Sequence, residues 1–253
     1  MNIKKRVLFI CAHPDDAELY GGGFIVKFSS IVEITVLIVS NGQEGANLFE
    51  NDNLAEIRYK EAQDSANFSG FKLKFLNYQD GEIENTIHLR RDIIRVIREV
   101  SPHIIFTHKN NDYHPDHRHL SQCVQDSLVG IYCPGYLKEI QAIDYIPLVL
   151  FFWNEFKTPR EFQPDVCIDI SDVIEKKEEM LRKHTSQFNS RGLIEEELYI
   201  KNRNIFNLCF DKALIKNSPS NYNPCYAEAY EICEYITKTD REKGIDILKE
   251  IIQ

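Results

Sequence analysis

The chain has 253 residues, of which 43% are hydrophobic and 27% are charged, a composition typical of one large globular domain or of a domain with a modest extension. A chain of this length can bury most of the surface that its unfolded form exposes, so folding requires neither disulfides nor a structural metal. The formal net charge is −9 and no basic run is longer than Lys4-Lys5-Arg6, which excludes the basic stripe that a nucleic-acid-binding protein needs.

The first half of the chain alternates short β-branched runs with segments of helical periodicity. The predicted strands are Val7–Cys11, Glu33–Val39, Leu73–Leu76 and His103–Thr107. The predicted helices are Glu18–Phe28, Leu54–Phe68, Leu89–Val100 and Asp116 to about Leu128. This alternation predicts a Rossmann-like, three-layer α/β/α fold with a mostly parallel sheet, whose ligands bind at the carboxyl ends of the strands.

The second half is less regular and contains no linker that would divide the chain. The predicted elements are strands at Ile146–Trp153 and Val166–Ile170 and helices at Asp172–His184, Leu193–Leu208 and Arg241–Ile252. Ser171 is the expected N-cap of the helix that follows it. We therefore expect a single domain over residues 1–253, in which residues 1–135 form the Rossmann-like half with the metal site and residues 136–253 complete the pocket.

The seven cysteines are odd in number and include no CxxC pair. This pattern predicts reduced thiols in a cytoplasmic protein, several of them packed in the core. No apolar run approaches the roughly 18 residues of a membrane helix, and the run behind the basic N-terminus is too short for a signal peptide. The sequence is compatible with a homo-oligomer.

Two turns rich in His and Asp follow predicted strands. In the first, His13 and Asp16 are three residues apart around Pro14, so both can bind one ion, and His117 of the second turn supplies a third ligand. Two His and one carboxylate, with an open position for water, are the ligands of a catalytic zinc site. The same set also binds Fe²⁺ or another divalent metal. Asp15, beside Asp16, is then the candidate general base.

The second turn supplies the candidate group for the oxyanion. His114 lies three residues before His117 and can stabilise the oxyanion or protonate the leaving amine. Either Asp116 or Asp112 can accept the other ring N–H of His114 and fix its tautomer. The competing interpretation of each turn is a simple helix cap, with one Asp of the first turn capping the first helix. Two such turns at strand ends favour a metal site.

These residues carry a resemblance to a known family. The segment AHPDDAEL at residues 12–19, followed by DYHPDH at residues 112–117, resembles the PIG-L (LmbE-like) de-N-acetylase family. Weaker similarities are RYKEA at residues 58–62, HTSQ at 184–187 and YAEAY at 226–230, where the family more often has Phe at position 230. The resemblance implies an LmbE-like fold. It also implies the roles already given: His13, Asp16 and His117 as zinc ligands, Asp15 as base, and His114, supported by Asp116, at the oxyanion.

Several weaker signals concern the pocket. Arg58 either holds sugar hydroxyls or a phosphate, or pairs with Glu61 on the surface. Glu44 lies in a polar loop that we expect at the pocket mouth, and His184 is either a substrate or supporting contact or a C-terminal helix cap. Trp153 either stacks on a sugar or, as we favour, belongs to the core. The three glycines at 21–23 do not have GxGxxG spacing and indicate close packing of a helix on the sheet rather than dinucleotide binding.

The sequence therefore predicts a zinc-dependent hydrolase that removes an acetyl or similar acyl group from an amino sugar, such as an N-acetylglucosaminyl compound. One alternative is an amidase that acts on a thiol conjugate or another non-sugar amide with the same metal centre. Another is a non-catalytic sugar-binding or scaffold protein that keeps zinc for stability. The partner expected in the first two cases is a small molecule.

Overall fold

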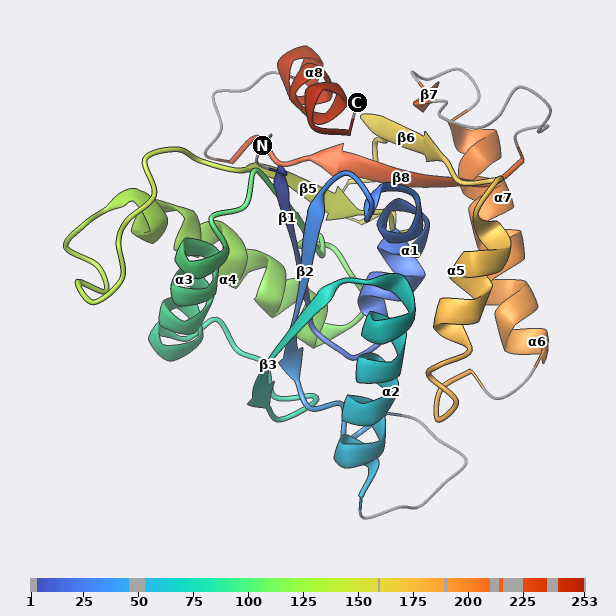
Figure 1. The fold of residues 1–253 in the computed structure, drawn as a ribbon, viewed down its shortest axis with the longest axis horizontal. Coiled ribbons are helices and arrows are strands. Elements are labelled where there is room, and N and C mark those ends of the chain that lie inside the picture. The colour runs from blue at the N-terminus through green and yellow to red at the C-terminus, as the bar shows by residue number, and fades with distance from the viewer. Residues whose placement is uncertain are drawn as a thin grey trace.

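A computed structural model describes residues 4–45, 53–158, 160–188, 191–209, 214–215, 225–235 and 241–252. Its strands form one eight-stranded sheet with the order β3-β2-β1-β4-β5-β8-β6-β7 (Figure 1). Strand β8 pairs antiparallel with both of its neighbours, and all other pairs are parallel. The strands are β1 (Arg6–Cys11), β2 (Glu33–Ser40), β3 (Lys72–Tyr78), β4 (Ile104–Thr107), β5 (Leu148–Phe152), β6 (Val166–Asp169), β7 (Leu214–Ile215) and β8 (Ala227–Ile232).

Helices cover both faces of the sheet. Helices α3 (Ile87–Val100) and α4 (Pro115–Tyr132) lie on one face, and α1 (Asp16–Phe28), α2 (Leu54–Ser69) and α5 (Ile174–Leu181) lie on the other (Figure 1). The remaining helical segments are α6 (Arg191–Ile194), the π-helical η1 (Glu195–Ile200), α7 (Lys201–Leu208) and α8 (Arg241–Ile252). The predicted three-layer α/β/α fold with a mostly parallel sheet is confirmed.

Alternate residues of β1 show how the sheet separates the two cores. Leu8 and Ile10 pack in the cluster that includes residues of α3 and α4, whereas Val7 and Phe9 pack in the cluster that includes residues of α1 and α5. Every one of these side chains is fully buried. A strand buried on both faces is the arrangement that a parallel sheet covered by two helical layers requires.

The glycines of α1 allow this helix to approach the sheet closely. A Cβ atom at Gly21 would overlap the ring of Phe9, and one at Gly23 would overlap the side chain of Ile170. Close packing of a helix against the sheet is therefore confirmed as the reason for glycine here.

Strand β8 was not among the predicted elements. It contains Glu228 and Glu231, which are both buried, and buried carboxylates are rare unless they are paired. Glu228 accepts hydrogen bonds from the backbone N–H groups of Gly23 (2.7 Å) and Phe24 (2.8 Å) and pairs with Lys177 (2.7 Å). These partners come from distant segments of the chain. Without knowledge of them, two glutamates argue against a buried strand, and for this reason β8 was not predicted.

The predicted cap of the helix after β6 is wrong. Helix α5 begins at Ile174 rather than Asp172, its N-cap position is Val173, and no side chain caps it. Ser171 instead donates its hydroxyl to Asp169 Oδ1 (2.7 Å) and accepts the backbone N–H of Cys225 (2.8 Å). Its hydroxyl therefore connects the end of β6 to the segment that leads into β8.

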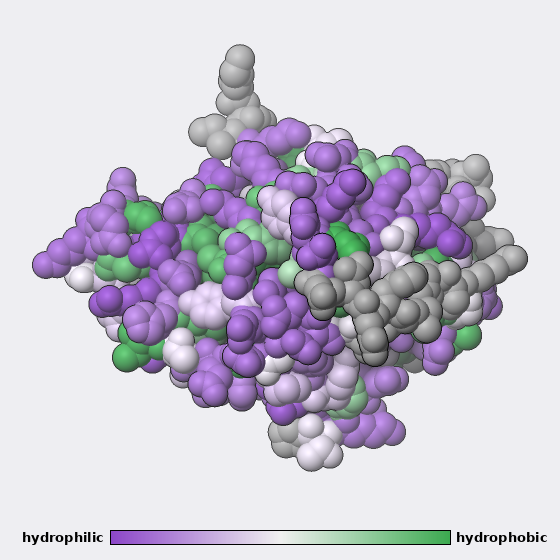
Figure 2. All heavy atoms as spheres, turned by 90° about the horizontal axis from the view of Figure 1, so that it is seen from below, coloured by the Kyte–Doolittle hydropathy of each residue, from purple (hydrophilic) through white to green (hydrophobic). Residues whose placement is uncertain are grey.

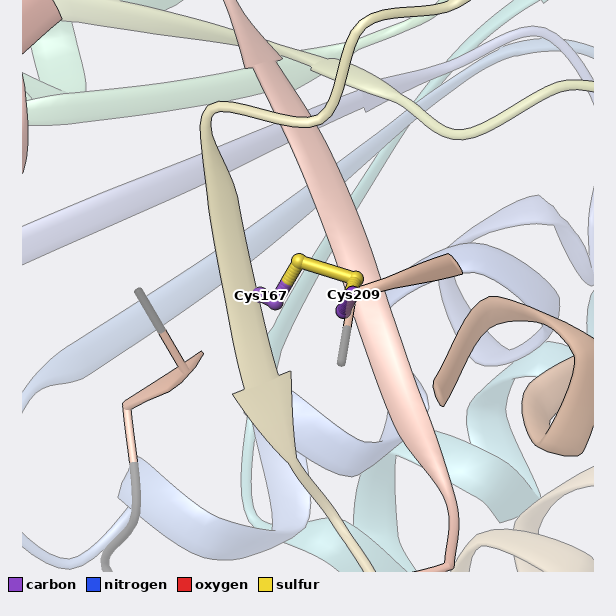
Figure 3. The surroundings of a disulfide bond; sticks show 2 residues. All are labelled: Cys167 and Cys209. Atoms are coloured by element: carbon purple, nitrogen blue, oxygen red, sulfur yellow. A yellow bond between two sulfur atoms is a disulfide. The ribbon is translucent and has the colours of Figure 1, made fainter. Parts of the chain in front are cut away.

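The prediction that all seven cysteines are reduced thiols is wrong for two of them. Cys167 of β6 and Cys209, directly after α7, form a disulfide (Figure 3). They are 42 residues apart in the chain and only the fold brings them together. Because stable disulfides are rare in reducing compartments, the cysteines give no support to the expected cytoplasmic location. Cys11 and Cys123 are buried in the two main cores, as expected for core cysteines.

The arrowheads of β2 and β3 point downward in Figure 1, so the carboxyl ends of these two strands lie at the lower edge of the sheet in this view. Figure 2 views the molecule from this side, and its coloured surface is mostly hydrophilic with hydrophobic residues in small groups. Among the described residues, no helix combines the length and the apolarity needed to cross a membrane.

Candidate active site and metal centre

The two predicted turns meet at one edge of the sheet. The first turn follows β1 and the second follows β4, and these two strands are adjacent and parallel. His13 Nδ1 lies 3.1 Å from His117 Nε2 and 3.6 Å from Asp16 Oδ2, and His117 Nε2 lies 3.5 Å from Asp16 Oδ1. The three predicted ligands therefore converge on one point.

The spacing of these donor atoms fits zinc. Bonds of about 2.0–2.1 Å at tetrahedral angles place two ligand atoms about 3.3 Å apart, close to the observed separations.

The surrounding charge also favours a cation. Burial lowers the pKa of His13, but hydrogen bonds to Asp116 and Asp80 outweigh it and raise that pKa to about 10. Burial likewise lowers the pKa of His117, but Asp16 and Asp112 raise it to about 9. The carboxylates that raise these two pKa values give the site a negative charge, which a bound cation can neutralise.

Carboxylates lie beside the second ring nitrogen of each of the two histidines proposed as ligands. His13 Nε2 is 3.0 Å from Asp80 Oδ1 and 3.3 Å from Asp116 Oδ2, and His117 Nδ1 is 3.1 Å from Asp112 Oδ1. Such partners fix the ring orientation and the tautomer of a metal-binding histidine. Asp80 was not among the predicted site residues. It follows β3, so the rule that ligands gather at strand ends could have indicated it.

Asp112→Asn is expected to weaken zinc binding about 10–100-fold, because the variant removes the charge beside His117 Nδ1. Competition with a chromogenic chelator measures the change in Kd. Asp144→Asn is the matched control, since Asp144 is exposed. An unchanged Kd for Asp112→Asn would show that Asp112 does not support the ligand.

Asp15 lies beside the ligands in a strained conformation. Its φ is 130° and its ψ is −19°, a combination that costs a non-glycine residue about 1–3 kcal/mol. Arg58 holds the turn, because its Nη2 donates to Pro14 O (2.8 Å) and lies 3.2 Å from Asp15 Oδ2. Burial raises the pKa of Asp15, the charge of Arg58 opposes this effect, and the net pKa is about 6. A carboxylate with this pKa is suited to accept and return a proton near neutral pH.

No side-chain carboxylate contacts the ring of His114 among the hydrogen bonds of the described residues. His114 Nδ1 instead accepts the backbone N–H of Asp116 (3.2 Å), so His114 is the N-cap of α4. The Asp116 carboxylate accepts the N–H groups of Gly81 (2.8 Å) and Ile83 (3.2 Å) and faces His13. The expectation that a side-chain carboxylate fixes the tautomer of His114 is therefore wrong, because a backbone N–H does so.

The predicted cap of α1 by an Asp side chain is also wrong, since no side chain caps that helix.

His108 belongs to the site, although it was not among the predicted site residues. It is 1% exposed, its ring stacks on that of His117 with centroids 3.8 Å apart, and its Nε2 lies 3.1 Å from Asp16 Oδ2. Burial and the neighbouring His117 lower its pKa to about 4, so the ring is neutral. His108 directly follows β4 (Ile104–Thr107), and this position was the available signal.

His13, Asp16 and His117, the three proposed ligands, line a cavity of about 440 Å³. Its lining includes Glu44 and Arg58, two of the three expected substrate contacts, together with Gln187. His184, the third, is fully buried, with Nε2 3.1 Å from Glu18 Oε1, and it is not part of the cavity lining. The alternative pairing of Arg58 with Glu61 at the surface is wrong, because Arg58 is buried and Glu61 bonds to Ser186.

Comparison with known proteins gives relatives along most of the chain. The family model PIG-L, described as GlcNAc-PI de-N-acetylase, matches residues 8–128. The diacetylchitobiose deacetylase of Thermococcus kodakarensis is 31% identical over 198 residues, which cover 74% of this chain and 72% of that protein. The chain belongs to the PIG-L family.

Two further relatives of this PIG-L protein extend the comparison. "Probable N-acetyl-alpha-D-glucosaminyl L-malate deacetylase 2" of Bacillus anthracis is 26% identical, over 76% of this chain and 85% of that protein. The solved structure of N,N'-diacetylchitobiose deacetylase from Pyrococcus horikoshii matches with a TM-score of 0.76 and 26% identity, over 92% of this chain and 85% of that chain. The family is one of deacetylases, so this PIG-L protein is an enzyme of the hydrolase class.

Proposed function

We propose that this PIG-L protein is a zinc-dependent hydrolase that removes an N-acetyl group, or a similarly small acyl group, from an N-acetylglucosaminyl compound. The observation that carries the proposal is the convergence of His13, Asp16 and His117 at the floor of an open cavity, with Asp15 beside them. Relatives named for the deacetylation of diacetylchitobiose and of an N-acetylglucosaminyl malate support the choice of substrate.

Zinc held by His13, Asp16 and His117 would polarise the amide carbonyl and lower the pKa of a water molecule. Among the residues of the chain, Asp15 carries the proton from the water to the leaving nitrogen. Asp15 accepts a proton from the attacking water, whose oxygen forms a bond to the carbonyl carbon. The C–N bond breaks, and the proton held by Asp15 passes to the leaving nitrogen. The second proton of the water, left on the new hydroxyl of the carbonyl carbon, also passes to the amine, so the products are acetate and the protonated amine, and atoms and charges balance.

His114 is the residue proposed to stabilise the oxyanion. Burial lowers its pKa, which keeps the ring neutral, and Nδ1 accepts the backbone N–H of Asp116. The ring proton of the neutral form is therefore on Nε2, where it can be donated to a negatively charged oxygen in the cavity that His114 lines. Arg58 keeps Asp15 ionised and in place through its contacts with Asp15 Oδ2 and Pro14 O.

The test is an assay of acetate and free amine with the zinc-loaded protein. The substrates are N-acetylglucosamine, N,N'-diacetylchitobiose and an S-conjugate of an N-acetylated thiol. We expect equal amounts of acetate and amine from at least one of the two sugars. Turnover of the thiol conjugate alone would contradict the amino-sugar proposal, and no turnover of any substrate would contradict the enzyme proposed here.

A further inference from the structure

A second cavity adjoins the metal cavity and plays no part in the chemistry described above. Its volume is about 420 Å³, and Leu19, Tyr20 and Tyr113 line both cavities. Tyr113 is close to the reacting groups, since its ring centroid lies 5.7 Å from that of His114 and 6.1 Å from that of His117. Sites for small ligands occupy about 300–1,000 Å³, so the two cavities together have room for more than one sugar ring.

Aromatic rings form much of the wall of this second cavity. Trp153, Phe156 and Tyr113 line it, and the rings of Tyr113 and Phe156 lie 5.5 Å apart. Trp153 is only partly buried, and Lys201 Nζ lies 5.9 Å from the centre of its ring. A half-buried aromatic face offers apolar surface to the C–H side of a sugar ring.

The polar groups of the second cavity carry one excess negative charge. Among the described residues that line the cavity, Glu155 and Glu197 contribute two carboxylates, and Lys201, the one cation among them, pairs with Glu197 at 2.6 Å. Asn154 is 5% exposed, and its side-chain NH₂ has no hydrogen-bond partner among the described residues. Carboxylates and an amide can hydrogen-bond hydroxyl groups, whereas the excess negative charge repels an anion.

We propose that the second cavity binds a neutral second sugar attached to the N-acetylglucosaminyl unit, and that it discriminates against an anionic substituent such as malate. The inference rests on the proposed function and makes it narrower. The amide-bearing ring occupies the metal cavity, and the next ring lies beyond Tyr113 against Trp153. The preferred substrate is then a neutral oligosaccharide that contains at least two sugar units.

The experiment compares kcat/KM for three substrates: N-acetylglucosamine, N,N'-diacetylchitobiose and an N-acetylglucosaminyl malate. The wild type is expected to favour the disaccharide over both others. In Trp153→Ala, the ratio of kcat/KM for the disaccharide to that for the monosaccharide should fall about tenfold, because stacking surface is lost only for the second ring. Tyr132→Ala, at an exposed tyrosine of α4, is the matched control and should keep the wild-type ratio.

A charge reversal tests the discrimination against anions. Glu155→Lys should raise kcat/KM for the malate conjugate relative to the disaccharide several-fold, and added salt should weaken this gain. A wild-type ratio near one for disaccharide and monosaccharide, a preference for malate, or an unchanged ratio in Trp153→Ala would overturn the inference while leaving the deacetylase proposal intact. If no substrate is hydrolysed, the proposed function fails. Calorimetric binding of N,N'-diacetylchitobiose to wild type and Trp153→Ala still tests the cavity, and equal Kd values would overturn the inference.

Discussion

Asp15→Asn is expected to lower kcat for amide hydrolysis roughly 10²–10⁴-fold, the contribution that a positioned general base makes. The amide of Asn cannot accept a proton, although it has the shape of the carboxylate that it replaces. Zinc binding should persist, because the three proposed ligands are other residues and Asp15 Oδ2 faces Arg58. Steady-state kinetics and metal analysis by mass spectrometry measure the two properties on the same sample.

The Asp15 result is informative only if the variant is folded and loaded with zinc. Its melting temperature and zinc content should therefore match those of the wild type within experimental error. Turnover within threefold of the wild type would exclude Asp15 as the base. Loss of zinc together with loss of turnover would instead assign Asp15 to the ligand set and overturn the division of roles proposed here.

His117→Ala is expected to abolish both zinc binding and turnover, because it removes one of three proposed ligands. The loss in affinity should exceed the roughly 10–100-fold expected for removal of an outer carboxylate partner. Turnover should fall at least about 10²-fold, since metal catalysis contributes several kcal/mol and about 1.4 kcal/mol corresponds to tenfold in rate. Equilibrium dialysis with zinc and the acetate assay measure the two effects.

His88→Ala is the matched control for His117→Ala, because His88 is an exposed histidine on α3. It should keep its zinc and its activity. Removal of zinc from the wild type with a chelator should reproduce the loss of turnover seen in His117→Ala. Added zinc should then restore the turnover of the wild type but not that of His117→Ala. Full activity of the chelated wild type would show that the reaction needs no metal.

The convergence of the three proposed metal ligands could be predicted from the sequence, because the order of the strands in a parallel sheet determines which strand ends lie side by side. His13 and Asp16 follow one strand, His117 follows another, and parallel strands end at the same edge. The contacts of Asp116 were beyond such reasoning. Its carboxylate faces His13 and bonds to Gly81 and Ile83, and these partners are fixed by the path of the loop after β3 rather than by spacing in the chain.

The segments that were not predicted depend on pairings between distant residues. Glu228 and Glu231 argue against a buried strand until their partners are known, and the partners are Lys177 of α5 for the first and Lys109 for the second. The disulfide has the same origin, since Cys167 and Cys209 meet only after β6 and α7 have packed. Local sequence contains the period of a strand or helix but not the identity of a partner 40 or more residues away.

The position of β8 has a consequence for the order in which the chain can fold during synthesis. Strand β5 pairs with β4 on one side and with β8 on the other, yet β8 follows β5 only after residues 153–226 have been made. Until then the nascent chain has a hydrophobic strand, Leu148–Phe152, with one open edge. Open strand edges pair readily with other chains, so newly made protein is most exposed to aggregation in the interval before β8 leaves the ribosome.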